Sequence, residues 1–327
     1  MTRLDIEQRI WPMIEPFALS RGAFSAVATL VVTLTDSSGR RGRGEASGVS
    51  YAGETIQTMA AQLEAVRGAV ERGVDQREVL ALLPAGGARC ALDAAVWDLE
   101  AKRSGRSVAE RLGLSPPADF LTAVTIGIRS LDAYEARARA LGDFPLLKVK
   151  VDARMPLEAV AAVRRGAGSS AIIVDPNQSW TAEQTLQLAP ALKALGVVLL
   201  EQPIPAQASP ALAGRVCPIP ICADEAIRDV RDLAEVSRSY QFINIKLDKT
   251  GGLTAALALA DAAEALGLGL MVGCMAGGSL AMAPAAMLVP RCRFVDLDAP
   301  MLFSADWADG MTYRAGRASF PSRRLWG

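Results

Sequence analysis

The sequence predicts an α/β protein in which an N-terminal α+β capping domain covers a modified (β/α)8 TIM barrel. From about residue 120, short apolar runs end in polar residues and alternate with Ala- and Leu-rich stretches of helical pattern. Eight such runs follow in series, and their ends lie roughly 22–26 residues apart, the length of one βα unit. No GxGxxG or GxxxxGKS/T motif follows any of them, which argues against an open nucleotide-binding sheet. Eight units in series therefore favour a closed barrel.

The segment before the barrel has a mixed pattern. Val27–Thr35 and Arg41–Glu45 flank a Ser38-Gly39 turn, which predicts a β-hairpin. Thr55–Val70 and Ala88–Lys102 predict two helices, and in the second a row of small apolar residues forms one face. These elements predict an α+β cap over one mouth of the barrel.

The domain boundaries follow from a proline-rich stretch. Ser115-Pro116-Pro117 has the composition of a linker between the two patterns. We therefore expect a capping domain at 1–118, a barrel catalytic domain at 119–300, and a C-terminal tail at 301–327 that returns to the capping domain.

Each predicted barrel strand is a short apolar run rich in β-branched residues. In chain order the strands are Thr122–Gly127, Leu146–Val151, Ala171–Asp175, Val197–Gln202, Ile219–Glu225, Phe242–Leu247, Leu268–Gly273 and Arg293–Asp298. Because active sites of such barrels lie at the C-terminal ends of the strands, the polar residues at those ends are the candidate functional residues.

The composition excludes several functional classes. Lys plus Arg and Asp plus Glu are equal, at 35 each, so the net charge gives no indication of a nucleic-acid or membrane partner. The longest uncharged stretch, Met275–Pro290, is broken by glycines and prolines and predicts a buried helix behind a loop, not a membrane span. The chain has no histidine, which excludes Ser-His and Cys-His triads and His-ligated metals.

The cysteines and the N-terminus indicate the compartment. The five cysteines are odd in number and show no CxxC spacing, which gives neither a disulfide framework nor a zinc site. The N-terminus has no apolar segment typical of a secretory signal. We therefore expect a cytoplasmic protein.

Three acidic residues end consecutive predicted strands. Asp175, Glu201 and Asp224 end the third, fourth and fifth strands, which are neighbours in a barrel. Isolated charges at such positions are costly to bury, and clustered carboxylates repel one another. A hard divalent cation would satisfy all three; Mg²⁺ prefers such oxygen ligands, and the same set also accepts Mn²⁺. Pairing of each carboxylate with an arginine from a neighbouring loop is the alternative.

Lysine is scarce and concentrated in two segments, KVK at 148–150 and KLDK at 246–249. Lys150 and Lys246 lie on the second and sixth predicted strands, which stand opposite each other in a ring of eight. Two bases on opposite faces of one carbon are what a 1,1-proton transfer requires. A divalent cation, Lys148 and partial burial would lower the lysine pKa, whereas the carboxylates would raise it. Ordinary salt bridges are the alternative for both lysines.

Five motifs, in this order, resemble the muconate-lactonising branch of the enolase superfamily. They are KxK at 148–150, VDPNQSW at 174–180, LLEQP at 199–203, ADE at 223–225 and NIKLDKTGG at 244–252. The resemblance covers nearly the whole chain. It implies Asp175, Glu201 and Asp224 as magnesium ligands, and Lys150 and Lys246 as the acid–base pair that works through a metal-stabilised enediolate.

The same resemblance implies a set of substrate-binding residues. Dipeptide epimerases carry an Asp-x-Asp on the eighth strand that holds the substrate's α-ammonium group, here Asp296 and Asp298, which strand alternation places on one face. An arginine in a mobile N-terminal loop, here Arg21 within 16–22, pairs with the glutamate side chain of the substrate. Ser47–Thr55 resembles a second capping loop. Further substrate-lining positions are Thr125, Lys148, Cys274 and Ala276.

The expected function is Mg²⁺-dependent epimerisation of L-Ala-L-Glu and L-Ala-D-Glu in murein peptide turnover. The second residue of the dipeptide is left open, because Gly277 and Gly278 stand where relatives have bulkier residues. Alternatives on the same scaffold are cycloisomerisation, o-succinylbenzoate synthesis and N-acylamino-acid racemisation, whose substrates lack a free ammonium group. A barrel that binds a metal and a carboxylate without turnover is a third reading. The expected partner is a small dipeptide, with no nucleic acid or membrane, and homo-oligomer formation is open.

Overall fold

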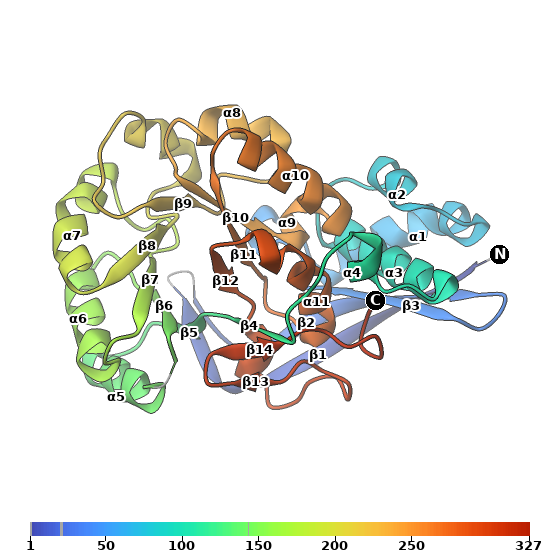
Figure 1. The fold of residues 1–327 in the computed structure, drawn as a ribbon, viewed down its shortest axis with the longest axis horizontal. Coiled ribbons are helices and arrows are strands. Elements are labelled where there is room, and N and C mark those ends of the chain that lie inside the picture. The colour runs from blue at the N-terminus through green and yellow to red at the C-terminus, as the bar shows by residue number, and fades with distance from the viewer. Residues whose placement is uncertain (1, 20–21, 143) are drawn as a thin grey trace.

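The computed structural model describes residues 2–19, 22–142 and 144–327. In Figure 1 a ring of parallel strands surrounded by helices occupies the left of the view, and an antiparallel sheet with its own helices extends to the right. The predicted fold class, a barrel with a separate N-terminal α+β part, is confirmed.

Eight parallel strands form the barrel sheet, hydrogen-bonded in chain order. They are β5 (Val124–Ile126), β6 (Leu146–Lys150), β7 (Ala171–Asp175), β8 (Val197–Glu201), β9 (Ile221–Ala223), β10 (Phe242–Lys246), β11 (Gly269–Gly273) and β12 (Phe294–Asp296). Each lies within a predicted range. The first and last strands meet where the backbone N–H of Ala123 donates to the carbonyl oxygen of Val295 at 2.8 Å, which joins the two edges of the sheet.

The interior of the barrel contains a separate apolar cluster. Its buried members are Ala123, Leu146, Ile173, Leu199, Cys222, Met271 and Phe294. Side chains two positions apart on a strand point to the same face, so the residues two positions further along form the next layer towards the C-terminal ends of the strands. That layer includes Thr125, Lys148, Asp175, Glu201, Asp224 and Asp296. The apolar layer therefore forms the floor under the polar residues that the sequence singled out.

Helices cover the outside of the barrel. The longer ones are α5 (Leu131–Ala140), α6 (Pro156–Gly166), α7 (Ala182–Ala194) and α10 (Leu253–Ala265). The connections after β8 and β9 are shorter: the 3₁₀ helix η2 (Ala206–Leu212) contains Pro210, and η3 (Val230–Asp232) leads into α8 (Leu233–Val236). The buried helix predicted near the end of the barrel is α11 (Ser279–Ala285), followed by η4 (Ala286–Arg291).

The N-terminal part is a three-stranded antiparallel sheet, β1 (Thr2–Leu19), β2 (Gly22–Asp36) and β3 (Arg41–Ala46), in the order β1-β2-β3. The predicted β2–β3 hairpin is confirmed. β1 is an additional strand, and it lies at the edge of the sheet, where its prolines at 12 and 16 are tolerated. Of the segment 16–22, expected as a loop, residues 16–19 belong to β1 and Gly22 begins β2, whereas residues 20 and 21 lie outside the described residues. Helices α1 (Ile56–Arg72), α2 (Gln76–Leu82), α3 (Gly87–Ser104) and α4 (Val108–Arg111) complete the part.

The small-residue face of α3 packs directly on β3. A Cβ atom at Gly42 would lie 2.2 Å from the carbonyl oxygen of Ala95, and one at Gly44 would lie 2.1 Å from that of Ala91. Only glycine permits so close an approach of strand and helix backbones. The row of alanines predicted on α3 is thus the surface that faces these glycines.

The last residues of the chain lie against the N-terminal part. Trp326 Nε1 donates to the carbonyl oxygen of Ala94 at 2.9 Å, and the backbone N–H of Gly327 donates to Asp98 at 2.8 Å. The hairpin of β13 (Tyr313–Arg314) and β14 (Arg317–Ser319) extends β4 (Asp119–Leu121). The tail therefore links the beginning of the barrel to α3.

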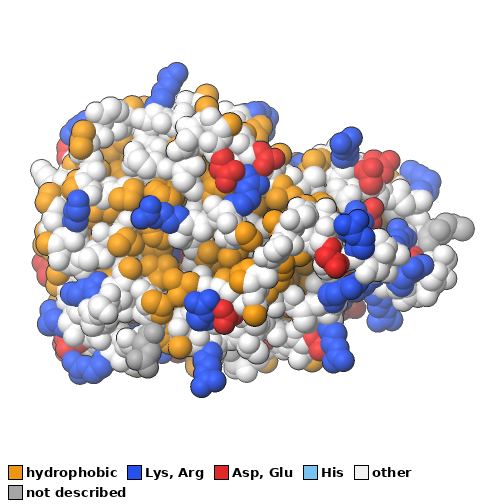
Figure 2. All heavy atoms as spheres, viewed as in Figure 1, with side chains coloured by type: hydrophobic (Ala, Val, Ile, Leu, Met, Phe, Trp, Pro, Cys, Tyr) orange, Lys and Arg blue, Asp and Glu red, His pale blue; other side chains and the backbone are white. Residues whose placement is uncertain are grey.

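The surface shows no segregation of charge on the face in Figure 2. Apolar side chains are exposed mainly over the barrel, whereas Lys and Arg side chains are frequent over the N-terminal end, with acidic side chains among them. Within the described part of the chain, no helix combines the length and apolar character needed to cross a bilayer. All five cysteines are free thiols.

Candidate active site

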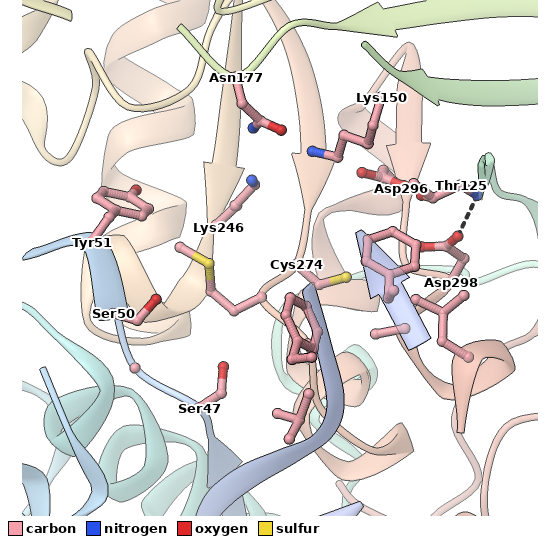
Figure 3. A pocket seen from close by; sticks show the side chains of 18 of the residues that line it. Ser47, Ser50, Tyr51, Thr125, Lys150, Asn177, Lys246, Cys274, Asp296 and Asp298 are labelled. Atoms are coloured by element: carbon pink, nitrogen blue, oxygen red, sulfur yellow. Dashed lines mark hydrogen bonds between the residues drawn. The ribbon is translucent and has the colours of Figure 1, made fainter. Parts of the chain in front are cut away.

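The C-terminal ends of the barrel strands open into one cavity of about 640 Å³ beneath the capping part (Figure 3). Most residues singled out by the sequence line it: Thr125, Lys148, Lys150, Asp224, Lys246, Cys274, Ala276, Asp296 and Asp298. Asp175 and Glu201 are fully buried and contact the cavity-lining Lys148. Arg21 lies outside the described residues, and its role stays a prediction.

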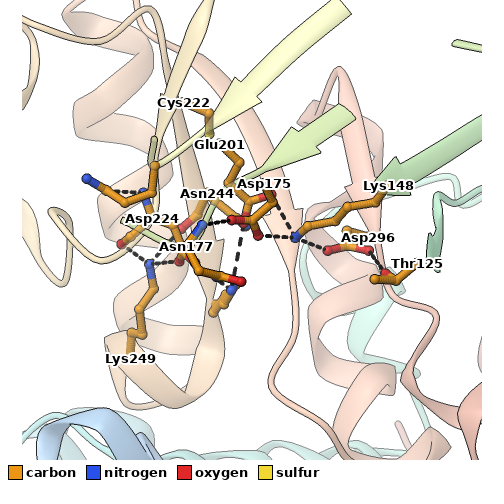
Figure 4. A network of polar contacts seen from close by, with 12 residues as sticks. Thr125, Lys148, Asp175, Asn177, Glu201, Cys222, Asp224, Asn244, Lys249 and Asp296 are labelled. Atoms are coloured by element: carbon orange, nitrogen blue, oxygen red, sulfur yellow. Dashed lines mark hydrogen bonds and ion pairs between the residues drawn. The ribbon is translucent and has the colours of Figure 1, made fainter. Parts of the chain in front are cut away.

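Lys148 lies at the centre of a buried ion-pair network (Figure 4). Its Nζ atom is 2.6 Å from Asp296 Oδ2, 2.7 Å from Glu201 Oε2 and 3.3 Å from Asp175 Oδ2. Lys150 Nζ lies 2.5 Å from the same oxygen of Asp175. Strand alternation places the side chains of Lys148 and Lys150 on the same face of β6, so both reach Asp175 on the neighbouring strand β7.

A second pair of lysines surrounds Asp224. Lys246 Nζ lies 2.6 Å from Asp224 Oδ2 and 3.8 Å from Glu201 Oε1. Lys249 Nζ lies 2.6 Å from Asp224 Oδ1 and also donates to the backbone carbonyl oxygens of Asp224 and Asn244. The side chain of Asn244 donates to Glu201 Oε1 at 2.9 Å. Asp224 is therefore held from both sides, and its orientation is fixed by β10 and the helix α9 (Leu247–Thr250) that follows it.

Burial and charge act in opposite directions on these groups. Burial opposes the charge of Lys246, yet the carboxylates of Asp224 and Glu201 raise its pKa well above the usual value. Burial also opposes ionisation of Asp224, but Lys246 and Lys249 hold its pKa well below the usual range. Glu201 differs, because burial and the neighbouring Asp175 raise its pKa to about 7. For Lys246 the carboxylates therefore outweigh burial and the nearby Lys148.

The backbone turns sharply after two of the strands that carry acidic residues. Asn177 and Gln178 have φ angles of 47° and 68°, and Gln202 has 35°, all in the left-handed region that side chains other than glycine rarely adopt. Hydrogen bonds hold these turns: the Gln178 N–H donates to the carbonyl of Gln202 at 2.9 Å, and Gln202 Oε1 accepts the N–H of Asp224 at 2.8 Å. The strained turns thus tie the backbones of the three acidic residues together.

Asp175, Glu201 and Asp224 form a donor set that fits a hard divalent cation. All are carboxylates on adjacent strands, and Glu201 Oε2 is buried without a hydrogen bond, although Lys148 Nζ is 2.7 Å away. Among the described residues no three acidic side chains stand together as a ready metal cage. The ammonium groups of Lys148 and Lys246 lie between neighbouring carboxylates and separate them.

Asp296 and Asp298 both line the cavity, but by different geometry. β12 ends at Asp296, and Asp298 has helical-region angles (φ −100°, ψ 0°) at the start of η5 (Ala299–Leu302). Asp298 therefore lies beyond the strand, so strand alternation does not determine the direction of its side chain. The turn after β12 directs this side chain into the cavity. The Thr125 N–H donates to Asp298 Oδ2 at 2.6 Å. Burial and the nearby Asp296 raise the pKa of Asp298 to about 7, although the Thr125 hydrogen bonds and Lys148 act against this rise.

The segment 47–55 covers the cavity from the capping side. Asp248 Oδ1 accepts the backbone N–H groups of Ser47 at 3.0 Å and Gly48 at 2.8 Å. Glu54 accepts the N–H of Val49 at 2.6 Å. Ser47, Gly48 and Tyr51 line the cavity, so the predicted second capping segment lies where the resemblance implies.

The β1–β2 hairpin forms another part of the rim through residues 17 and 22–24. The rings of Phe17 and Phe24 lie 5.9 Å apart, and both line the cavity. The carbonyl oxygen of Ala18 accepts the backbone N–H of Ile128 at 2.9 Å, which joins the hairpin to the segment after β5. The described part of this rim is therefore apolar.

Several residues of the site were not singled out by the sequence analysis. Asn177, Asn244, Asp248 and Lys249 support the acidic residues or the cap, and Tyr51 lines the cavity. A signal existed for the first four, since they belong to motifs already noted on either side of the strand ends. Tyr51 also lies in a segment already noted, 47–55, but no helix or strand periodicity there indicates which side chain faces the cavity.

Comparison with known families agrees with this geometry. The mandelate racemase/muconate lactonizing enzyme N-terminal domain matches residues 1–113, and the enolase C-terminal domain-like family matches residues 131–323. An L-Ala-D/L-Glu epimerase of Escherichia coli (strain K12) is 39% identical over 318 residues, covering 97% of this chain and 99% of the relative. An N-acetyl-D-glutamate racemase of a Pseudoalteromonas species is 42% identical over 288 residues, covering 87% and 91%.

Solved structures of other proteins have the same fold. An enolase family member from Agrobacterium tumefaciens with homology to dipeptide epimerases, with bound sodium and L-Ala-L-Glu, has a TM-score of 0.95 at 38% identity and covers 100% of both chains. A dipeptide epimerase from Methylococcus capsulatus, complexed with Mg and L-Arg-D-Lys, has a TM-score of 0.91 at 32% identity and covers 99% of this chain and 98% of that one.

Proposed function

Because the chain belongs to the enolase superfamily and is an isomerase of its racemase and epimerase class, we propose that it interconverts L-Ala-L-Glu and L-Ala-D-Glu. One observation carries the proposal: Lys150 and Lys246 come from the second and sixth strands of an eight-stranded barrel and line one cavity. Figure 3 shows both side chains directed into it. A carbon between them is open to a proton acceptor on one face and a proton donor on the other.

The proposed reaction inverts the glutamate α-carbon by 1,1-proton transfer. One lysine, as the neutral amine, takes the α-proton and leaves a planar carbanion next to the carboxylate. The other lysine, as the ammonium ion, delivers its Nζ proton to the opposite face, and the roles reverse for the other diastereomer. Lys148, buried beside Lys150, carries positive charge towards the carboxylate that develops negative charge.

We assign Mg²⁺ as the cofactor, held by Asp175, Glu201 and Asp224, with Mn²⁺ as a substitute of the same ligand preference. Mg²⁺ would supply positive charge beside the substrate carboxylate and so stabilise the deprotonated carbon. The oxygen-only donor set and the magnesium in the Methylococcus capsulatus epimerase support this assignment.

We propose that Asp296 and Asp298 bind the substrate ammonium group and that Arg21 binds the glutamate side chain. The raised pKa of Asp298 supports the first part, since a cation placed between the two carboxylates relieves their repulsion. The second part is supported by the resemblance of segment 16–22, in which Arg21 is the one arginine.

N-acylglutamate racemisation is the second candidate, favoured by the 42% identity to an N-acetyl-D-glutamate racemase. Both relatives act on a glutamate derivative, so the two candidates share the acid side chain and differ in the group on the glutamate nitrogen. Asp298→Asn separates them. Epimerisation of L-Ala-L-Glu should fall with this substitution, whereas racemisation of N-acetylglutamate, which has no ammonium group, should not.

The decisive experiment is proton NMR of L-Ala-L-Glu in D₂O with the protein and Mg²⁺. We expect the glutamate α-proton signal to disappear and signals of L-Ala-D-Glu to appear. Exchange only in N-acetylglutamate would establish the second candidate. Exchange only in other dipeptides would keep the epimerase reaction and assign it a different substrate.

We further place the enzyme in the cytoplasm and in murein peptide turnover. The five free thiols and the dipeptide substrate support these assignments. Isotope labelling of cell-wall peptides in cells with and without the gene would test the second, and assembly into homo-oligomers stays a prediction.

A further inference from the structure

Glu45 is a buried carboxylate in the capping sheet that joins four separate segments. It is the penultimate residue of β3 and is 1% exposed. Its Oε1 atom accepts Trp11 Nε1 at 2.6 Å, Thr29 Oγ1 at 2.8 Å and the backbone N–H of Gly278 at 3.2 Å. Its Oε2 atom accepts Trp307 Nε1 at 2.8 Å. These donors are neutral and belong to β1, β2, the segment after β11 and the C-terminal tail.

The bond to Gly278 is the one that concerns the active site. β11 ends at Gly273, and the next residues, Cys274–Ala276, form a wall of the cavity. Gly278 comes two residues after that wall and is the N-cap of α11. Glu45 therefore holds the far end of a short connection whose middle faces the substrate space.

The packing around Gly278 leaves this connection little freedom. A Cβ atom there would lie 2.8 Å from Trp11 Cζ2 and 2.9 Å from Trp307 Nε1, so both indoles rest on the glycine backbone. The guanidinium of Arg9 lies 4.0 Å from the Trp307 ring centre and 4.5 Å from that of Trp11, which keeps the two rings in place. The absence of a side chain at Gly278 is thus explained by the two indoles that share Glu45.

We propose that Glu45 is a positioning residue for the active site: it fixes the wall Cys274–Ala276 against the substrate by holding Gly278 to the capping sheet. The proposal rests on the proposed function only for its kinetic consequence. A buried acceptor that loses its charge, or is removed, leaves several donors unsatisfied, so the wall loosens although Lys150 and Lys246 are untouched.

The structural test uses Cys274 as a reporter. N-Ethylmaleimide labelling is followed residue by residue by mass spectrometry in the parent and in Glu45→Ala and Glu45→Gln. Cys217 and Cys292, partly exposed like Cys274 but remote from the cavity lining, serve as internal references. We expect Cys274 labelling to rise about tenfold in Glu45→Ala, the factor typical of a lost buried hydrogen-bond acceptor. Glu45→Gln should show a smaller rise, because its remaining oxygen still accepts the Gly278 N–H.

A matched control separates positioning from general destabilisation. Asp98 is also fully buried in the capping part and accepts backbone N–H groups, from Arg43 and Gly327, but it does not touch the cavity wall. Asp98→Ala should lower thermal stability without a selective rise in Cys274 labelling. Equal Cys274 labelling in Asp98→Ala and Glu45→Ala, or no rise in either Glu45 variant, would overturn the proposal.

Steady-state kinetics of the Glu45 variants give a second test. We expect Glu45→Ala to raise KM for L-Ala-L-Glu about tenfold, and Glu45→Gln to raise it by a smaller factor, while kcat falls by much less in both, since the wall lines the cavity and the lysines are unchanged. A fall in kcat at constant KM would contradict a positioning role for this wall. If the parent does not turn over this dipeptide, the proposed function fails, but the Cys274 result still decides the role of Glu45.

Discussion

Asp248 offers a sharp test of how the capping segment is held to the barrel. It follows Lys246 by two residues, is 7% exposed, and accepts the backbone N–H groups of Ser47 and Gly48. Burial raises the pKa of Asp248 to about 6, and the nearby carboxylate of Glu54 adds to the rise, against the effect of those two hydrogen bonds. The buried thiol of Cys90 on α3 also interacts electrostatically with Asp248. Asp248→Asn keeps an acceptor oxygen and removes the buried charge.

The raised pKa fixes the sign and size of the effect. The folded protein binds the Asp248 proton more tightly than the unfolded chain, so stability falls as pH rises from 3.8 to about 6. The full rise of the pKa from 3.8 to about 6 corresponds to about 3 kcal/mol. Asp248→Asn should therefore match the parent near pH 4 and exceed it by about 3 kcal/mol at pH 7.

Urea unfolding of both proteins at several pH values measures this difference. Asp119→Asn is the control: Asp119 is exposed and pairs with Arg317, which lowers the pKa of Asp119, so its loss should bring no gain at neutral pH. A difference between Asp248→Asn and the parent that does not change with pH, or a less stable Asp248→Asn at pH 7, would refute the reasoning.

Three further predictions test the chemistry and the cap. Lys150→Ala and Lys246→Ala should each lower epimerisation by about 10²–10⁴-fold while still exchanging the α-proton of one diastereomer, a different one for each, by NMR in D₂O. Chelation with EDTA should abolish turnover and lower the melting temperature, and added Mg²⁺ should restore both. Gly44→Ala should destabilise the protein by about 3 kcal/mol or more, because its Cβ would lie 2.1 Å from the carbonyl oxygen of Ala91. Gly68→Ala, at an exposed position within α1, should instead stabilise the protein by up to about 1 kcal/mol. Thermal unfolding measures both changes.

The strand ends show what a sequence can predict. Lys148, Asp175 and Asp224 each follow an apolar residue of the barrel floor by two positions, so strand periodicity places them in one layer before any contact is known. Order along the chain then gives neighbours, because the barrel pairs strands in chain order. Strand periodicity and strand order can both be read from the sequence. Together they were sufficient to predict that these carboxylates and lysines lie close together.

Other features depend on contacts between distant segments. Glu45 is one charged residue at the end of a hairpin strand, and nothing near it in the sequence indicates that Gly278 and Trp307 will donate to it. β1 carries several charges and two prolines, which hides the strand pattern, and only its position at the sheet edge permits them. Asp298 reaches the site through a turn and not through the strand alternation that predicted its direction. The division at 118 and 300 stays a prediction.

Around the short helix α9, a residue that strand periodicity identifies stands next to residues whose contacts the sequence does not indicate. Lys246 is the last residue of a strand, so periodicity identifies it; Asp248 and Lys249 follow where the strand has become a helix, and their directions diverge. Lys246 lines the cavity, Asp248 holds the cap and Lys249 holds Asp224. Residues 246–249 thus connect the proposed base, the proposed metal ligand Asp224 and the capping segment 47–55. A backbone change in α9 would therefore disturb all three at once, whereas Asp248→Asn changes only the charge at the cap.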